Sequence, residues 1–432
     1  MDRAEQSAAQ FAYPRYPPMR LVCALDAILR FALAIGNNPL RRPSQSPHEN
    51  PPDSIGPEHA LAVEEMLPLA TVVNLFLRFS SWACLRPIFA VGVLFGSVEQ
   101  MTAQPTPLSA YNVAASQTSV SGLSSGGYMA VQFEIAFSSL IKGAGIIAGG
   151  PYYCAQGNPT TATSVCSCTA FLCNNRPGAT RVQTLVRITD RNARRGAIDP
   201  PLNLARHRIW LFSGKADSIV PQTIMNDLAS YYTSYVDRSD ISYKTDIDAQ
   251  HAQPTDFYGN SCATLGDPYI NNCAYDAAGE LLKWIYGSLN PRNDGELSGI
   301  FVQFNQAEFL ADPVSHGMDK NGWLYVPAAC RHQQPCRLHI AFHGCNQYQG
   351  YSYIDGSGLV FFGTTFVRNA GYNKWADSNR MIVLYPQATA TLTNPEGCWD
   401  WWGYDDANYA LKSGRQMSTV HKMFQRISRA LP

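Results

Sequence analysis

The sequence has no excess charge of either sign. Its 432 residues include 33 Lys and Arg against 33 Asp and Glu, and charged residues make up only 15% of the chain. A chain without a basic surplus gives no support to a nucleic-acid partner or to binding at an anionic membrane. The low charged fraction, together with 28 prolines and 22 tyrosines, is instead typical of a compact secreted domain with many ordered loops.

The chain also lacks an apolar run long enough to cross a membrane. Arg78 and Arg86 divide the apolar part of the N-terminal region into runs near ten residues, whereas a bilayer span needs about 20. A short apolar run after arginines and before small polar residues is the layout of a signal peptide. We therefore predict that residues 1–104 are an N-terminal extension with a signal-peptide-like leader. A translation start at Met66, a membrane anchor and a disordered extension are the alternatives.

No C-x-x-C pair and no histidine pair accompanies the clustered cysteines, although the chain has 12 of them. Ten lie between Cys154 and Cys398 in polar, loop-like surroundings. Short loops closed by cysteines are typical of disulfides in an oxidising compartment, so we expect disulfides and a secreted protein, extracellular or periplasmic. Zinc is the less favoured alternative, and no metal is predicted. The close neighbours are Cys262 with Cys273, Cys330 with Cys336, and the group Cys154, Cys166, Cys168 and Cys173, whose pairing stays open.

Residues 105–432 contain no Gly/Ser linker, repeat or charge run, which predicts a single domain. Strand-like and helix-like segments alternate along it. Alternation predicts an α/β fold with a mostly parallel sheet, helices on both faces, and functional residues on loops at the carboxyl ends of strands. The expected strands include residues 118–122, 208–214, 240–247, 322–327, 337–344 and 381–386. The expected helices cover residues 129–140, 221–235, 277–289, 364–378 and 414–431.

A G-x-S-x-G pattern occupies Gly122 to Gly126. The pattern is too short to be informative alone. It lies between an expected short strand and an expected amphipathic helix, however, and this context is typical of a nucleophile elbow. We therefore predict that Ser124 is a nucleophile, which requires a histidine as base and an acid that holds the histidine tautomer.

Asp217 and His251 follow Ser124 in the required order. Asp217 comes just past one expected strand, and His251 follows another strand-like segment. An aspartate here could instead cap a helix, and a single loop histidine could be a surface residue. The order and the loop positions together favour a Ser-Asp-His triad, with His316 as the main competing histidine.

Chemistry at such a serine also needs N–H donors for an oxyanion. The residue after the nucleophile, Ser125, supplies one, and the turn His343-Gly344-Cys345 at the end of a strand has the form expected for the second. In an ordinary α/β-hydrolase that strand precedes the serine, but here it follows it. We therefore predict a circularly permuted α/β-hydrolase whose domain termini lie close together. A simple turn is the alternative.

Several longer segments resemble the extracellular polyhydroxybutyrate (PHB) depolymerases, in particular the single-domain, circularly permuted type. They include "SVSGLSSGGYMAVQ", "HAQPTDF", "LHIAFHGCNQ" and "NPEGCWDWWGY", and the resemblance extends from about Thr106 to Pro432. It implies a catalytic domain with a triad and two oxyanion-binding N–H groups. These are Ser124, Asp217 and His251, and the N–H groups of Ser125 and Cys345. The resemblance also implies a disulfide between Cys345 and Cys398 that braces the oxyanion loop.

The resemblance further implies a secreted serine esterase that hydrolyses poly(3-hydroxybutyrate) or a similar aliphatic polyester through an acyl-enzyme to short hydroxyacids, without a cofactor. Aromatic residues in "CWDWWGY" either line a groove for the polymer or form core; the resemblance favours Tyr404, then Trp402, as substrate contacts. The expected partner is the polyester surface or its oligomers, with no nucleic acid or stable protein partner, and the protein is expected to be a monomer. A feruloyl, acetyl-xylan or other polyester esterase and a catalytically silent polymer-binding surface protein are the alternatives.

Overall fold

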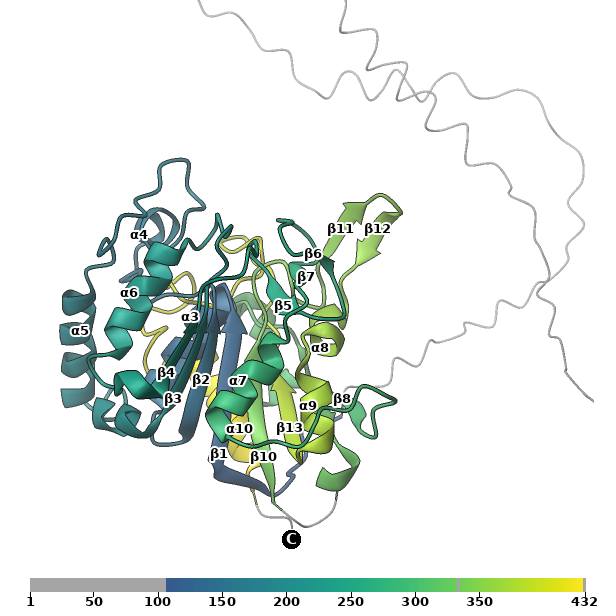
Figure 1. Ribbon diagram of the computed structural model, residues 1–432. Coiled ribbons are helices and arrows are strands. Elements are labelled where there is room, and N and C mark those ends of the chain that lie inside the picture. Colours follow the sequence, from purple (N-terminus) through teal and green to yellow (C-terminus); the bar gives the residue numbers. More distant parts are fainter. Residues whose placement is uncertain (1–105, 332–334, 430–432) are drawn as a thin grey trace, which may run out of the picture. The chain divides into compact units, whose positions relative to one another are not determined.

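Eight strands form one central sheet in the computed structural model, which describes residues 106–331 and 335–429 (Figure 1). They are β1 (Val113–Leu123), β2 (Ile141–Ile147), β3 (Arg208–Phe212), β4 (Ile241–Lys244), β8 (Ile300–Asn305), β9 (Asn321–Val326), β10 (Cys336–Phe342) and β13 (Met381–Tyr385). The sheet order is β4-β3-β2-β1-β10-β13-β9-β8. Neighbours from β4 to β13 are parallel, and β9 and β8 are added antiparallel at one edge.

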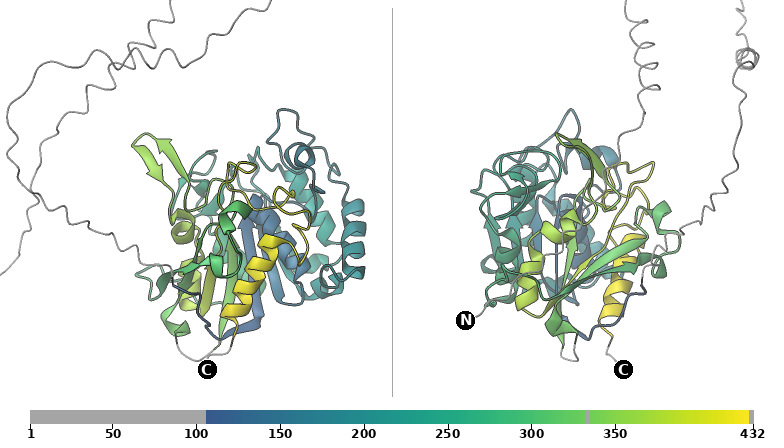
Figure 2. Two further views of the ribbon diagram at one scale, coloured as in Figure 1. Left: turned by 180° about the vertical axis from the view of Figure 1, so that it is seen from behind. Right: turned by 90° about the vertical axis from the view of Figure 1, so that its right-hand side faces the viewer.

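Helices cover both faces of this sheet. They are α3 (Ser125–Ala136), α4 (Pro159–Ser164), α5 (Val182–Arg194), α6 (Gln222–Tyr232), α7 (Ala277–Tyr286), α8 (Thr365–Asn369), α9 (Tyr372–Ser378) and α10 (Arg415–Ile427). Helices α7 and α9 lie in front of the sheet in Figure 1, whereas α10 comes to the front when the molecule is turned (Figure 2). The predicted α/β fold, with a mostly parallel sheet between two helical layers, is confirmed.

The sheet order confirms the predicted circular permutation. The late strands β10, β13, β9 and β8 lie on one side of β1, and β2, β3 and β4 lie on the other. The end of α10 reaches the chain just before β1, because the Tyr111 N–H donates to the Ile427 carbonyl at 2.9 Å and Arg426 Nη1 donates to the Leu108 carbonyl at 3.1 Å. The second half of the domain thus occupies the place that the first half has in an ordinary α/β-hydrolase.

Burial explains why the central elements form. All five residues of β13 are buried, as expected for a central strand of a parallel sheet with helices on both faces. All residues of α3 are buried as well. The prediction of an amphipathic helix after Ser124 was wrong, because α3 is covered on its outer side as well. There Gln132 Nε2 donates to the Asp400 carbonyl at 3.1 Å, and a helix without a solvent face has no polar stripe.

Some elements differ from the predictions. The single helix expected over residues 364–378 is two helices, α8 and α9, which Gly371 separates with a φ of 96°. The strand β2 and the helix α5 were not predicted. Two smaller units complete the fold: a sheet of β5 (Gln253–Thr255), β6 (Asn260–Ser261) and β7 (Ile270–Asn272), and a hairpin of β11 (Ser352–Asp355) and β12 (Gly358–Phe361).

Disulfides close loops throughout the described residues. The pairs are Cys154–Cys166, Cys168–Cys173, Cys262–Cys273, Cys330–Cys336 and Cys345–Cys398. Within residues 106–331 and 335–429, no helix is both long and apolar enough to cross a bilayer. The predicted leader in residues 1–104 lies outside the described residues.

Candidate active site

Ser124 lies on a strained turn between β1 and α3. Its backbone has φ 57° and ψ −124°, a conformation that non-glycine residues adopt at a cost and that is concentrated at functional sites. A Cβ atom on Gly122 would lie 2.1 Å from the Gly126 carbonyl oxygen, and one on Gly126 would lie 2.3 Å from the Phe342 carbonyl oxygen. The two glycines of the G-x-S-x-G pattern are therefore needed for close approach of three backbone segments, which is the geometry of a nucleophile elbow.

Asp217 and His251 lie on loops after β3 and β4 and contact each other. Asp217 Oδ2 is 2.9 Å from His251 Nδ1, and both side chains are almost fully buried. Asp217 Oδ1 also accepts the N–H groups of Ile219 and Val220 at 2.9 and 2.8 Å, which fixes the carboxylate. An Asp that accepts from Nδ1 leaves Nε2 of the imidazole as the basic nitrogen.

Ser124 and His251 line the same cavity, which has a volume of about 130 Å³. No hydrogen bond joins these two residues in the described part of the chain. Catalytic contacts are often long in unliganded sites and shorten when substrate binds. The structure therefore brings the three predicted triad residues to one site, with the Asp–His contact already formed.

Two residues beside Ser124 have backbone N–H groups without a partner in the described part of the chain. The turn at Gly344 packs against the elbow so closely that a Cβ on Gly344 would lie 3.4 Å from Ser124 Cβ. Among the described residues, the N–H groups of Ser125 and Cys345 have no hydrogen-bond acceptor, and both residues line a cavity beside Ser124. Unpaired donors next to a nucleophile can bind an oxyanion.

Gln347, which the sequence did not single out, and His343 hold this turn in place. Gln347 Oε1 accepts the Gly344 N–H at 2.7 Å, and Gln347 Nε2 donates to the carbonyl groups of Pro268 and Tyr269, each at 3.0 Å. His343 Nδ1 donates to the Gly344 carbonyl at 2.7 Å, and His343 Nε2 accepts the Ala388 N–H at 3.0 Å. Burial lowers the pKa of His343 to about 4. The imidazole is therefore uncharged at neutral pH and supports the turn through these two hydrogen bonds.

A second cavity of about 270 Å³ adjoins the first and has an aromatic wall. Trp401 stacks on Tyr128 with ring centroids 4.0 Å apart, and Trp402 packs edge-on against Trp401. Of the two predicted substrate contacts, Trp402 lines this cavity. Tyr404 is not among the residues that line either cavity; its hydroxyl donates to the Cys398 carbonyl at 3.0 Å and accepts from Gln416 Nε2 at 2.9 Å.

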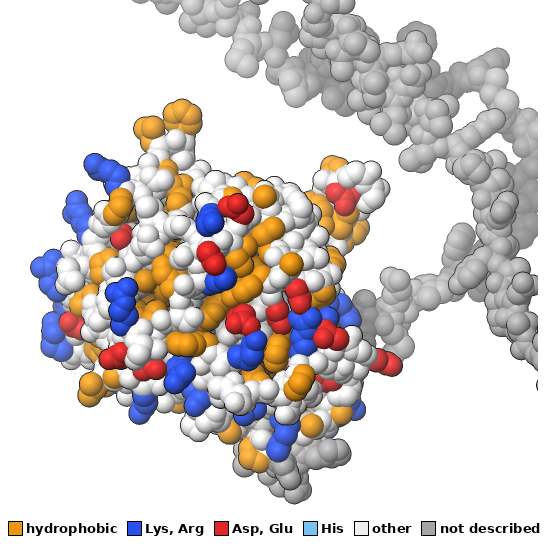
Figure 3. All heavy atoms as spheres, viewed as in Figure 1, with side chains coloured by type: hydrophobic (Ala, Val, Ile, Leu, Met, Phe, Trp, Pro, Cys, Tyr) orange, Lys and Arg blue, Asp and Glu red, His pale blue; other side chains and the backbone are white. Residues whose placement is uncertain are grey.

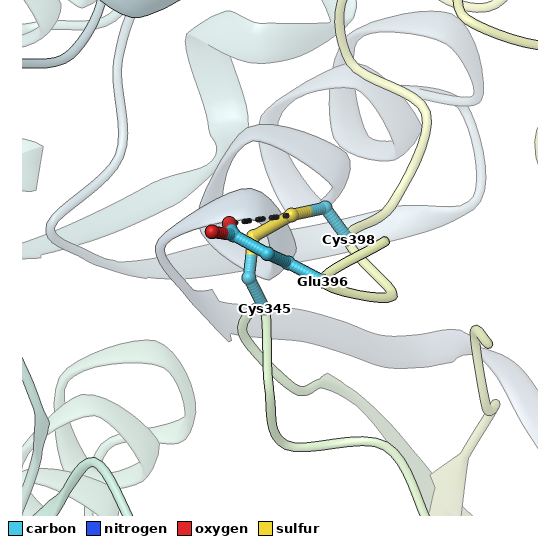
Figure 4. A group of neighbouring side chains, drawn as sticks. All are labelled: Cys345, Glu396 and Cys398. Carbon is cyan, nitrogen blue, oxygen red and sulfur yellow. Dashed lines mark hydrogen bonds between the residues drawn. A yellow bond between two sulfur atoms is a disulfide. The ribbon is translucent and has the colours of Figure 1, made fainter. Parts of the chain in front are cut away.

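The disulfide between Cys345 and Cys398 joins the turn at Gly344 to the loop before the tryptophans. Glu396 lies beside it, and one carboxylate oxygen and the two sulfur atoms lie within 4.8 Å of one another (Figure 4). This group does not fit a metal ion, because sulfur atoms bonded to each other are not the thiolates that bind metals. It does place a carboxylate directly at the two cavities beside Ser124.

The competing histidine His316 and the strand residue His339 lie elsewhere in the fold. His316 Nδ1 is 2.8 Å from Asp405 Oδ1, and His316 lines neither cavity. His339 is buried within β10, where its ring nitrogens contact the hydroxyl groups of Ser119 and Ser121 at 2.7 and 2.8 Å. Both histidines therefore have structural partners away from Ser124.

Comparison with known proteins gives close relatives, although no protein-family model matches the chain. The chain is 43% identical over 357 residues to a poly(3-hydroxybutyrate) depolymerase of Delftia acidovorans; the match covers 82% of this chain and 66% of that protein, just under two thirds. It is 41% identical over 331 residues to a polyhydroxybutyrate depolymerase of Talaromyces funiculosus, covering 73% of this chain and 90% of that protein.

Two solved structures are also similar over the full length of their chains. One is a PHB depolymerase from Penicillium funiculosum, with a TM-score of 0.66, 38% identity, and coverage of 76% of this chain and 100% of that one. The other is a serine-to-alanine variant of a PHB depolymerase in complex with an R3HB trimer, with a TM-score of 0.67, 38% identity and the same coverage. With these sequence and structural relatives, the chain belongs to the polyhydroxybutyrate depolymerase family.

Proposed function

We propose that this protein is a serine esterase that hydrolyses the ester bonds of poly(3-hydroxybutyrate) or a similar aliphatic polyester to short hydroxyacids. The observation that carries the proposal is the arrangement around Ser124. A strained serine shares a cavity with His251, whose Nδ1 contacts Asp217 at 2.9 Å, and lies beside two unpaired N–H groups. The family's named members act on the same polymer.

In the proposed mechanism, Ser124 Oγ attacks the ester carbonyl carbon while His251 Nε2 accepts its proton. Asp217 holds the imidazole and stabilises the imidazolium. The N–H groups of Ser125 and Cys345 bind the oxyanion of the tetrahedral intermediate. His251 returns the proton to the leaving alkoxide, which departs as the hydroxyl end of one product. Water, deprotonated by His251, then attacks the acyl-enzyme and releases a carboxylate product and free Ser124.

The cavities are consistent with a neutral, largely apolar ester chain. Tyr128, Trp401 and Trp402 form an aromatic wall, and Ile219 and Val220 add aliphatic surface. Apolar walls with a few placed polar groups are usual in sites for small uncharged ligands. We include Trp402 in the proposed substrate contacts and expect Tyr404 to support that wall from behind.

We also propose that the protein acts outside the reducing cytoplasm, as a monomer that works on polymer surfaces or oligomers. The disulfides within the described residues support an oxidising compartment. One of them, Cys345–Cys398, joins the two loops that border the proposed oxyanion site.

Replacement of the nucleophile tests the proposed function. Ser124→Ala should lower hydrolysis of PHB suspensions by at least about 1,000-fold, because the attacking oxygen is lost, with an unchanged circular dichroism spectrum. A fluorophosphonate probe should label the unmodified protein and leave Ser124→Ala unlabelled. Hydrolysis that persists in Ser124→Ala would contradict the assignment, and release of ferulate without clearing of PHB would favour the feruloyl esterase alternative.

A further inference from the structure

The two cavities beside Ser124 have a single formally charged side chain between them. The described residues that line them are otherwise uncharged, apart from the titratable His251, and the charged one is Glu396. Glu396 lines both cavities, as do Ser124 and Cys345. The fixed charge at the proposed reaction centre is therefore negative, and no basic side chain among the lining residues offsets it.

The position of Glu396 is well defined. Its backbone carbonyl accepts the Asn346 N–H at 2.8 Å, and two residues later Cys398 is bonded to Cys345. Figure 4 shows the Glu396 side chain beside this disulfide, with one carboxylate oxygen 4.0 Å from Cys398 Sγ. Within the described part of the chain the carboxylate makes no ion pair, and the side chain is exposed to solvent.

Basic side chains gather in other places. Arg176 and Arg181 line a separate cavity of about 610 Å³. Helix α4 separates it from the substrate cavities, because Thr161 lines the first and Thr163 lines the second. On the face shown in Figure 3, blue side chains follow the edge where α5 lies; that helix carries Arg191 and Arg194 in its last turn.

This distribution matters because the proposed reaction changes the charge of its ligand. An internal ester bond of the polymer is neutral, whereas hydrolysis leaves a carboxylic acid that is ionised at neutral pH. Two carboxylates a few ångströms apart repel each other, and the repulsion is reduced but not abolished by solvent and salt. The same repulsion acts on a chain end with a free carboxylate that enters the site.

Resting on the proposed function, we propose that Glu396 is a specificity-determining residue that disfavours carboxylate ligands. It favours neutral ester segments over acid-terminated ones and hastens the release of the acid product. The carboxylate does not help the chemical step, because a negative charge near the oxyanion site opposes the developing oxyanion. Removal of the charge should therefore leave the chemical step on neutral esters unchanged or slightly faster, while the acid product leaves more slowly.

The test compares two forms of one oligomer, the (R)-3-hydroxybutyrate trimer as its free acid and as its methyl ester. The unmodified protein should show a higher kcat/KM for the methyl ester. In Glu396→Gln the preference should fall by about twofold to tenfold, as the loss of one partly screened like-charge interaction gives. The matched control is Glu296→Gln, which removes an exposed carboxylate that lines neither cavity and should keep the preference.

Two further measurements separate charge repulsion from a structural role. Added salt should reduce the preference of the unmodified protein and leave that of Glu396→Gln unchanged, and the (R)-3-hydroxybutyrate dimer acid should inhibit Glu396→Gln more strongly. An equal loss of activity on both trimers would assign Glu396 a structural role and overturn the inference. An unchanged preference in Glu396→Gln would also overturn it while leaving the proposed function intact, whereas a protein that hydrolyses neither trimer would overturn the proposed function itself.

Discussion

At the scale of single residues, the turn at Ser124 depends on two glycines that have no side chain. Gly122 and Gly126 let β1, α3 and the end of β10 approach more closely than any side chain permits. The neighbouring Ser125 contributes differently, because its N–H has no acceptor among the described residues and is a proposed oxyanion donor, whereas its hydroxyl accepts only a long contact of 3.4 Å from the Trp399 backbone N–H. The two kinds of residue should therefore respond very differently to alanine.

We predict that Gly126→Ala is damaging and that Ser125→Ala is mild. The added Cβ of Gly126→Ala meets the Phe342 and His343 carbonyl oxygens at 2.3 and 2.4 Å. We expect destabilisation of about 1–3 kcal/mol and a fall in kcat of about 100-fold, because the oxyanion turn must move. Ser125→Ala should keep kcat/KM within about fivefold, since a weak neutral hydrogen bond contributes about 1 kcal/mol or less. Urea unfolding and hydrolysis of a soluble ester measure both; equal losses would contradict the distinction.

The sequence predicts the positions of the proposed triad residues better than those of the residues that support the neighbouring turn. Asp217 and His251 could be placed because a triad fixes both their order and their position after strands. Gln347 could not, because a buried glutamine that accepts one N–H and donates to two carbonyl groups has no sequence pattern of its own. Tyr404 was predicted as a substrate contact but lines neither cavity, because a run of adjacent aromatic residues does not reveal which ring faces the cavity.

At the scale of elements, the loop that carries the tryptophans is organised by one buried carboxylate. Asp400 Oδ1 accepts the N–H groups of Gly403 and Tyr404 at 2.7 and 3.0 Å, and Oδ2 accepts those of Asp405 and Asp406 at 3.3 and 3.0 Å. The Asp400 carbonyl is also bound by Gln132 on α3. The aromatic wall is thus linked by a hydrogen bond to the helix that begins directly after Ser124.

We predict that Asp400→Asn loosens this wall. The amide replaces one acceptor oxygen with N–H donors that face other N–H donors, which should cost about 1–3 kcal/mol of stability. KM for an (R)-3-hydroxybutyrate oligomer should rise by about tenfold, the factor that 1.4 kcal/mol of lost contact gives, while kcat for p-nitrophenyl acetate changes less. Trp402→Leu, which shortens the wall directly, should show the same KM effect without the loss of stability. An equal loss of kcat on both substrates would contradict a role confined to the wall.

Helices and strands could be predicted where apolar side chains recur with a helical or strand period. They could not be predicted where glycine is needed for close packing. The strand β2 reads "IKGAGII", and its glycines argue against a strand from sequence alone. In the structure a Cβ on Gly143 would lie 2.3 Å from the Arg208 carbonyl oxygen, and one on Gly145 would lie 2.9 Å from the Leu281 side chain. The glycines are present because β3 and α7 pack closely on this strand.

At the scale of the whole molecule, the permuted order keeps the central sheet intact but places the start and the end of the domain at a point where the chain of an ordinary α/β-hydrolase is continuous. The contacts of Tyr111 with Ile427 and of Leu108 with Arg426 replace the covalent link that joins these segments in an ordinary α/β-hydrolase. Stability should also depend on pH, because several titratable side chains are buried in the domain, among them His343 and Asp400. Two of them shift their pKa in opposite directions.

The dependence of stability on pH should reveal these buried groups. Burial lowers the pKa of His343 to about 4, below the usual value near 6.5, so the unfolded chain takes up the proton first. His343 therefore removes stability as the pH falls from about 6.5 to 4. Burial raises the pKa of Asp400 to about 6, against the lowering effect of its four N–H donors. The folded protein then takes up this proton first, and Asp400 adds stability as the pH falls from about 6 to 4.

We therefore predict changes of opposite sign in two variants. The free energy of unfolding, measured with urea between pH 6.5 and 4, should fall more steeply with decreasing pH in Asp400→Asn than in the unmodified protein. It should fall less steeply in His343→Gln, which keeps an acceptor for the Ala388 N–H but cannot titrate. Each slope should differ by up to about 1.4 kcal/mol per pH unit, the value for one proton. Slopes that change in the same direction in both variants would contradict the prediction, because a general loss of packing changes the stability at every pH and leaves the slope unaltered.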